Sequence, residues 1–182
     1  MATTREQIIQ STSELIENQG YHATGLNEIV KASGAPKGSI YYYFPNGKEE
    51  ITAEAVIYAG NTVAERIRTH LNITEDAPEA IQAFMQTIAH YVEESGFRAG
   101  GPLTTVASET ATTNEKLNQT CCQAYDQVRT AFEEKLNACG YSIPRAEALA
   151  WTLTAAIEGA VILCRTYHSG DPLRKIAIEM GN

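Results

Sequence analysis

One cation and three hydroxyl groups lie within a single stretch of six residues: Lys37, Ser39, Tyr41 and Tyr42. A lysine ammonium can bind a phosphate, and hydroxyl groups can hydrogen-bond to phosphates or to the edges of DNA bases. Gly38, inside the stretch, allows a partner to approach the backbone closely. These residue types indicate a surface suited to nucleic acid.

Two short helical patterns position this stretch. The first contains Leu26, Ile29 and Val30, has Thr24 or Asn27 available as its cap, and ends at Ala32-Ser33-Gly34. The second runs from Pro36, which suits the first helical position, to about Tyr43. Joined through Gly34, they form a helix-turn-helix unit over residues 24–44.

The apolar residues of this unit predict which face is free. We expect Ile29, Val30, Ile40 and Phe44 to pack the two helices against the preceding one. The other face of the second helix can then enter a DNA major groove. The alternative is that the three consecutive tyrosines, 41–43, pack the domain instead.

Charge separates this unit from the rest of the chain. Residues 22–48 hold three lysines and one glutamate, a net charge of +2, whereas the whole chain of 182 residues carries −8. A locally basic surface on an acidic chain is typical of a DNA-binding protein with separate further duties. Lys31 is interpreted as a solvated helix residue, and Lys48 could instead form a surface pair with Glu49 or Glu50.

The sequence shows no catalytic or metal-binding constellation. The four histidines do not pair with a carboxylate at zinc-site spacing, and adjacent Cys121-Cys122 lacks the CxxC spacing. We therefore predict no enzyme activity, no cofactor and no metal. A small enzyme using Glu158 as an acid or base remains an alternative, although no partner group for Glu158 is apparent.

Apolar residues recur at helical spacing along the chain and predict an all-α fold of about nine helices. The expected segments are 3–19, 26–33, 36–43, 48–70, 79–94, 103–110 (helix or irregular), 114–139, 144–168 and 171–180. A polar break at 72–78 predicts two domains, 1–70 and 71–182.

The apolar run 149–164 is short for a membrane span and contains Glu158, so we expect it to be buried in a core or against another subunit. The N-terminus has no basic and apolar leader pattern, which favours the cytoplasm.

Residues 20–51, GYHATGLNEIVKASGAPKGSIYYYFPNGKEEI, closely resemble the DNA-binding domain of TetR-family transcriptional repressors. The proline in APKGS and the extra glycine in FPNGKEE are similar to the LmrA/YxaF-type subgroup. Residues after 77 resemble the family in architecture only. The resemblance implies a three-helix DNA-binding domain followed by a larger effector-binding and dimerisation domain.

The resemblance also implies roles for single residues. Thr24 would cap the second helix and bond a phosphate, Lys37 and Gly38 would lie at the groove entrance, and Lys48 would hold a phosphate. Ser39 and Tyr42 would face the groove, while Tyr41 would bond the DNA backbone and be partly packed. Pro36 stands where a serine or threonine is often found, which removes a hydroxyl donor.

Beyond residue 77 the sequence offers candidates for two further sites. An effector pocket would be lined by apolar or amphipathic side chains with Glu158 as a polar anchor: Phe84, Met85, Ile88, Tyr91, Phe97, Leu103, Tyr125, Phe132, Trp151 and Glu158. Each apolar member could equally be plain core. A dimer interface would use small and apolar residues of the last two helices: Ala156, Ala160, Leu163, Leu173 and Ile176. Burial within one chain is the alternative.

The resulting expectation is a homodimeric repressor that binds a pseudo-palindromic operator in double-stranded DNA. A small apolar or aromatic effector would release it. As a bacterial protein it would be cytoplasmic, and associated with the nucleoid when bound to DNA. The alternative is a helical small-molecule-binding module that does not read DNA.

Overall fold

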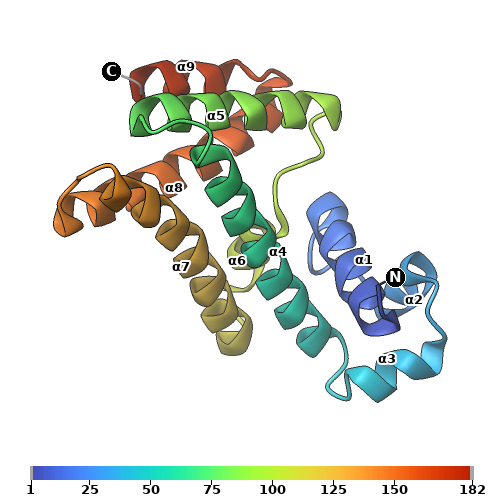
Figure 1. Cartoon of the computed structure of the whole chain (residues 1–182). Coiled ribbons are helices and arrows are strands. Elements are labelled where there is room, and N and C mark those ends of the chain that lie inside the picture. Colours follow the sequence, from blue (N-terminus) through green and yellow to red (C-terminus); the bar gives the residue numbers. More distant parts are fainter. Residues whose placement is uncertain (1, 181–182) are drawn as a thin grey trace. The chain divides into compact units, whose positions relative to one another are not determined.

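Helices account for the regular structure of the computed structural model, which describes residues 2–180. In that range the chain forms nine α-helices and no strand (Figure 1). They are α1 (Thr4–Gln19), α2 (Leu26–Ser33), α3 (Lys37–Tyr43), α4 (Lys48–Leu71), α5 (Ala77–Glu94), α6 (Pro102–Thr110), α7 (Glu115–Ala138), α8 (Ile143–Tyr167) and α9 (Asp171–Met180). The all-α prediction is confirmed, and the segment 103–110 is helical.

At the starts of α2 and α3 the structure gives the residues other roles than the sequence predicted. The N-cap of α2 is Gly25, whose N–H donates to Glu28 Oε2 at 2.8 Å, so neither Thr24 nor Asn27 is the cap. Pro36 occupies the N-cap of α3 rather than its first helical position. A glycine or a proline is tolerated there because the N–H of an N-cap residue takes no part in the helical hydrogen bonds, while the carbonyls of Gly25 and Pro36 each accept at least one.

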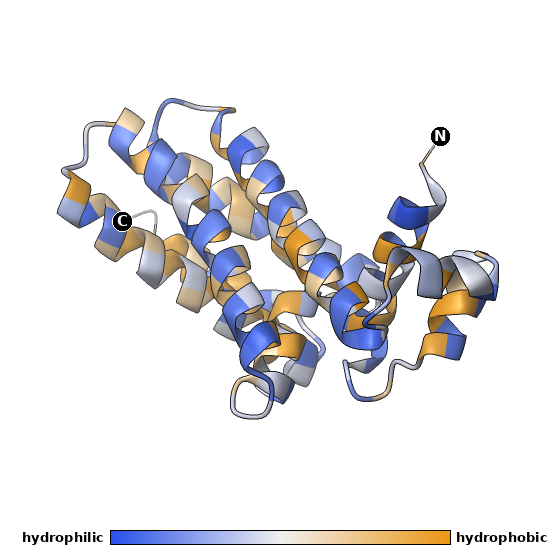
Figure 2. Cartoon of the chain, turned by 90° about the horizontal axis from the view of Figure 1, so that it is seen from below, coloured by the Kyte–Doolittle hydropathy of each residue, from blue (hydrophilic) through white to orange (hydrophobic). Residues whose placement is uncertain are grey.

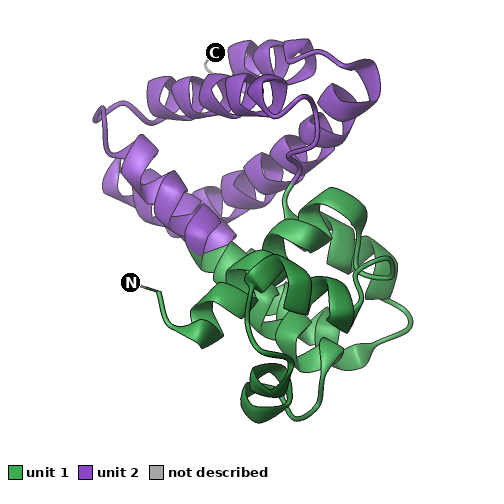
Figure 3. Cartoon of the chain, turned by 90° about the vertical axis from the view of Figure 1, so that its right-hand side faces the viewer, with its two compact units in different colours: residues 1–61, 101–125 green, residues 62–100, 126–182 purple. Residues whose placement is uncertain are grey.

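The chain divides into two compact units (Figure 3). Unit 1 comprises the described residues up to 61 together with 101–125, and unit 2 comprises residues 62–100 and 126–180. Helix α6 and the first part of α7 therefore pack with the N-terminal helices. The predicted boundary at residue 70 separates a DNA-binding domain from an effector-binding and dimerisation domain, and this functional division stays a prediction.

The core of unit 1 forms around α1. Its buried cluster consists of Ile8, Ile9, Ile29, Ala35, Ile40, Phe44, Ile51 and Ala55, and Leu15, Leu26, Val30 and Tyr43 pack partly buried against it. Hydrophobic and hydrophilic residues alternate along most helices, as amphipathic packing requires (Figure 2). The expected packing of Ile29, Ile40 and Phe44 is confirmed, with Val30 at the edge.

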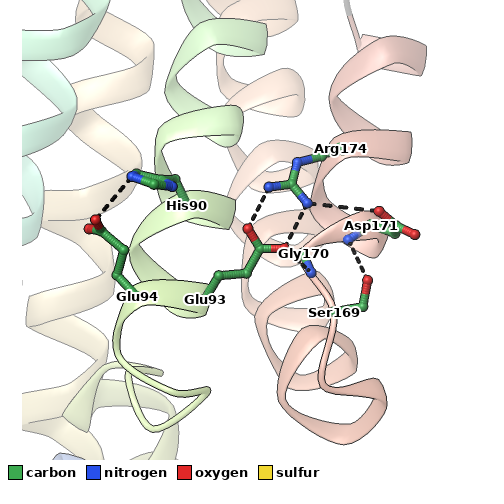
Figure 4. Close-up of polar contacts among 7 residues, drawn as sticks. All are labelled: His90, Glu93, Glu94, Ser169, Gly170, Asp171 and Arg174. Carbon is green, nitrogen blue, oxygen red and sulfur yellow. Dashed lines mark hydrogen bonds and ion pairs between the residues drawn. The ribbon is translucent and has the colours of Figure 1, made fainter.

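Unit 2 is held by contacts of α5 with α9 and α8. Glu93 on α5 accepts two hydrogen bonds from the Arg174 guanidinium, at 2.8 and 2.5 Å, and a third from the Gly170 N–H at 2.9 Å (Figure 4). These bonds, with that from Arg174 the strongest cause, lower the pKa of Glu93 to about 2. The pair therefore fastens α9 and the turn before it to α5.

Helix α8 is only partly buried within the chain. Among the described helices it is the one whose length and composition would suffice to cross a membrane, and 33% of its apolar stretch is buried. Trp151, Ile162, Leu163 and Tyr167 expose large parts of their side chains. The chain alone therefore leaves much of α8 exposed, and burial against another subunit, the second part of the expectation, stays a prediction.

Candidate nucleic-acid interface

The turn between α2 and α3 depends on Gly34. This residue ends α2 in the left-handed conformation, at φ +64°, which a glycine adopts without strain. The Ser33 hydroxyl donates to Ile29 O at 2.7 Å and accepts the Ala35 N–H at 3.3 Å. The chain therefore reverses sharply, with Ala35 buried and Pro36 exposed at the start of α3.

The apolar side of α3 fixes the helix on unit 1. Ile40 and Phe44 are buried, and the rings of Tyr43 and Phe44 lie 6.4 Å apart at an edge-to-face angle. Tyr43 is thus a packing residue. Tyr42 touches it edge-on, with ring centroids 4.9 Å apart, but extends away from the core.

The opposite side of α3 is open to solvent. Tyr42 is 77% exposed and Tyr41 53%, while Lys37 and Gly38 are exposed and Ser39 is half-buried. A Cβ added to Gly38 would meet no atom within 4 Å, so packing inside the chain does not require glycine there. The residues predicted to contact DNA at α3 therefore share one accessible surface.

Thr24 does not belong to that surface. Its side chain is buried, and its hydroxyl donates to Gly20 O at 2.7 Å. The predicted cap is wrong, and the hydroxyl is engaged within the protein. Thr24 instead stabilises the turn between α1 and α2.

Lys48, the first residue of α4, lies against that same turn. Its ammonium nitrogen is 4.2 Å from the centre of the Tyr21 ring and 3.5 Å from His22 O. Partial burial lowers the pKa of Lys48, and the charges of Glu109 and Glu28 oppose the shift. The alternative pairing with Glu49 or Glu50 is not formed: Glu49 binds Asn114 and Lys116, and Glu50 accepts the Asn46 N–H at 2.9 Å.

The effector-pocket candidates are distributed over both units and differ in exposure. Phe84, Met85, Leu103 and Phe132 are buried; Ile88, Phe97, Tyr125 and Glu158 are half-buried; Tyr91 and Trp151 are exposed. Within unit 2, Phe84 and Phe132 rings lie 6.3 Å apart, and Phe97 stacks on His168 at 5.3 Å.

Unit 2 has a cavity of about 220 Å³, and none of these ten candidates lines it. Its lining residues are Arg68, Leu71, Asn72, Ala131, Glu134, Lys135 and Ala138. Arg68 pairs there with Glu134, and Lys135 donates to Thr74 O. The pocket candidates therefore stay a prediction.

The dimer candidates also differ in accessibility. Ala160 and Leu173 are buried within the chain, Ala156 and Ile176 are half-buried, and Leu163 is 43% exposed. The dimer candidates did not include the large apolar residues of α8 and α9 that are at least half exposed: Ile143, Trp151, Ile162, Tyr167 and Ile178. Helical periodicity places Trp151 and Ile162 on one side of α8.

A recognition helix held on a buried core, with hydroxyls and a cation on its open face, defines a helix-turn-helix DNA-binding regulator. Residues 8–55 match the family described as bacterial regulatory proteins, tetR family. Residues 77–179 match the C-terminal domain described as transcriptional regulator LmrA/YxaF-like. The chain therefore belongs to the tetR family of transcriptional regulators, which are not enzymes.

Relatives and solved structures agree with this assignment. The chain is 41% identical over 176 residues to the HTH-type transcriptional regulator YxaF of Bacillus subtilis, covering 97% of this chain and 92% of YxaF. It is 37% identical to the HTH-type transcriptional regulator LmrA of the same organism, over 95% and 92% of the two chains. A TetR regulator from Chloroflexus aurantiacus matches with a TM-score of 0.78 and 29% identity, over 98% and 92%.

Proposed function

We propose that this chain is a homodimeric repressor that binds a pseudo-palindromic operator and is released by a small apolar or aromatic effector. The observation that carries the proposal is the open face of α3, where Tyr42 is 77% exposed beside Lys37 and Ser39 on a helix anchored by Ile40 and Phe44. Packing within the chain covers only about a quarter of the Tyr42 side chain and leaves its hydroxyl-bearing surface open to solvent. Contact with DNA accounts for this exposure: Tyr42 reaches base edges and Tyr41 reaches the backbone.

The contacts divide by chemistry. Ser39 and Tyr42 read base edges in the major groove, and Tyr41 bonds the DNA backbone. Lys37 and Gly38 lie at the groove entrance. Pro36, the N-cap of α3, has no hydroxyl to donate there. Lys48 binds a phosphate next to the start of α4.

Exposed apolar side chains on α8 and α9 support the homodimer. Trp151, Ile162, Leu163 and Ile178 together present more large apolar side chains than isolated surface positions require. Small residues between them on α8, Ala155 and Gly159, allow close helix packing. A homodimer that binds a pseudo-palindromic operator has its two recognition helices in successive major grooves, about 34 Å apart.

Effector release follows as a shift between two spacings of the α3 helices. The effector must bind the spacing that does not fit DNA more tightly than the one that does. In this proposal residues 1–70 read DNA, and residues 71–182 bind the effector and the second subunit. The protein acts in the cytoplasm, at the nucleoid when it is bound to DNA.

A reporter gene placed behind the DNA upstream of this chain's own gene tests the regulatory sign. Expression of the chain should lower reporter output, and the Tyr42→Ala variant should restore it. Raised output would make the protein an activator. Unchanged output, together with no binding of purified protein to that DNA, would favour a ligand-binding module that does not read DNA.

A further inference from the structure

A carboxylate from α6 contacts the turn between α1 and α2. Glu109 Oε2 accepts the backbone N–H of His22 at 2.8 Å, although the two residues are 87 positions apart in the chain. Both belong to unit 1. The α1–α2 turn, which precedes the helix-turn-helix, is therefore held by α6, a helix that the sequence analysis placed in the other domain.

Gly20 makes this contact possible. A Cβ at residue 20 would lie 2.4 Å from Glu109 Oε1, and the backbone there has φ +91°. Any other residue would push the carboxylate away from the turn and would also strain the backbone. The close approach of Glu109 is thus built into the local geometry.

Lys48 holds the same turn from another direction. Its Nζ lies 3.5 Å from His22 O and over the ring of Tyr21. Glu109 and Lys48 therefore engage the two backbone groups of one residue, His22. The charge of Glu109 also acts on Lys48, since it favours the protonated ammonium.

Other contacts join the same elements. The Gly101 N–H at the start of α6 donates to Glu17 Oε1 of α1 at 3.1 Å. Asn114, just after α6, donates to Glu49 Oε2 at 2.7 Å, next to Lys48 in α4. Helix α6 and its flanks thus contact α1, the α1–α2 turn and the start of α4.

We propose that Glu109 is a positioning residue for DNA binding. It fixes the α1–α2 turn, and through Tyr21 and His22 it holds the Lys48 ammonium where a phosphate can reach it. Glu109 itself touches no DNA. This inference rests on the proposed function, because it assigns Lys48 to a phosphate.

Three variants at residue 109 separate the effect of the hydrogen bond to His22 from the effect of the negative charge. Glu109→Gln keeps an oxygen that can accept the His22 N–H and removes the charge. Glu109→Asp keeps the charge but is one methylene too short, and Glu109→Ala removes both. Glu115→Ala is the matched control, because this exposed residue of unit 1 also carries one negative charge but its side chain bonds Gln119 rather than the turn.

Fluorescence anisotropy measures binding to the duplex upstream of the gene and to a scrambled duplex. We expect Glu109→Ala and Glu109→Asp to weaken binding to both duplexes about fivefold relative to Glu109→Gln, the scale of one hydrogen bond. Glu109→Gln and Glu115→Ala should bind at least as tightly as the unmodified protein. Amide exchange at His22, measured without DNA, should accelerate in the Ala and Asp variants and not in the Gln variant.

A double-mutant cycle completes the test. In a Lys48→Ala background the Ala and Gln variants at 109 should bind DNA equally, because the effect acts through Lys48. Equal binding of these two variants in the unmodified background would overturn the proposal, and so would a difference that persists without Lys48. If the unmodified protein and Glu115→Ala bind neither duplex at low salt, the proposed function fails and this inference fails with it.

Discussion

Replacement of Tyr42 by alanine should reduce the discrimination between operator and random DNA and destabilise the fold only slightly. Tyr42 is 77% exposed, so about a quarter of its surface is covered. A fully buried aromatic side chain removes roughly 150–250 Å² from water, so a quarter corresponds to about 40–60 Å². At about 25 cal/mol per Å² this stabilises the fold by roughly 1–1.5 kcal/mol. The better helix propensity of alanine offsets about 0.5 kcal/mol of the loss.

The effect on DNA should be larger and specific. One lost base contact typically costs about 1–3 kcal/mol, which is about 5- to 150-fold in affinity for each subunit bound. Binding to a scrambled duplex should change little, because phosphate contacts dominate there. Anisotropy titrations with both duplexes, together with urea unfolding, measure the two effects separately.

Tyr43→Ala is the matched comparison, since its ring packs on the buried cluster. It should lower the free energy of unfolding by about 2–3 kcal/mol, towards the range for large core aromatics. The reasoning is refuted if Tyr42→Ala weakens binding to the two duplexes by the same factor, or if it unfolds as readily as Tyr43→Ala.

Three further predictions concern other parts of the molecule. Lys48→Ala should flatten the slope of log affinity against log salt by about 0.9 per subunit, equally on both duplexes; a changed sequence preference would contradict a phosphate contact. Glu93→Gln should lower the melting temperature at pH 7, because the pKa of Glu93 is about 2 when folded against 4.5 ordinarily. Its stabilisation is present above about pH 4.5 and is lost as the pH falls towards 2, so the melting temperatures should converge there, and a constant difference would refute this. Leu163→Glu, on the exposed face of α8, should shift the protein to monomers in sedimentation, whereas Ile73→Glu, equally apolar and 78% exposed in the loop before α5, should not.

Local signals in the sequence predicted the helices well, because their ends depend on nearby residues. Thr3 and Glu6 form the reciprocal capping bonds that their spacing indicates, at 3.3 and 2.7 Å. Thr24 shows the limit of such reasoning. A threonine before a helix can cap it or can bond a preceding carbonyl, and here the hydroxyl binds Gly20 O.

Contacts between distant residues were the part that the sequence could not predict. The ring of Tyr21 under Lys48 and the bond from His22 to Glu109 join segments 27 and 87 residues apart. Periodicity gives each helix its apolar side but not its partner, so it could not predict that α6 packs on α1. The same limit applies to the pocket candidates. An apolar residue such as Phe132, which is buried, occurs at the same helical spacing in the sequence whether it packs in a core or lines a cavity.

Anisotropy of the purified protein on the duplex upstream of its own gene, against a scrambled duplex at two salt concentrations, tests the central claim most directly. Sequence-specific recognition predicts a preference of about 10³-fold or more for the upstream duplex. It also predicts a steep loss of affinity with salt on both duplexes. No binding to either duplex at low salt would contradict the account.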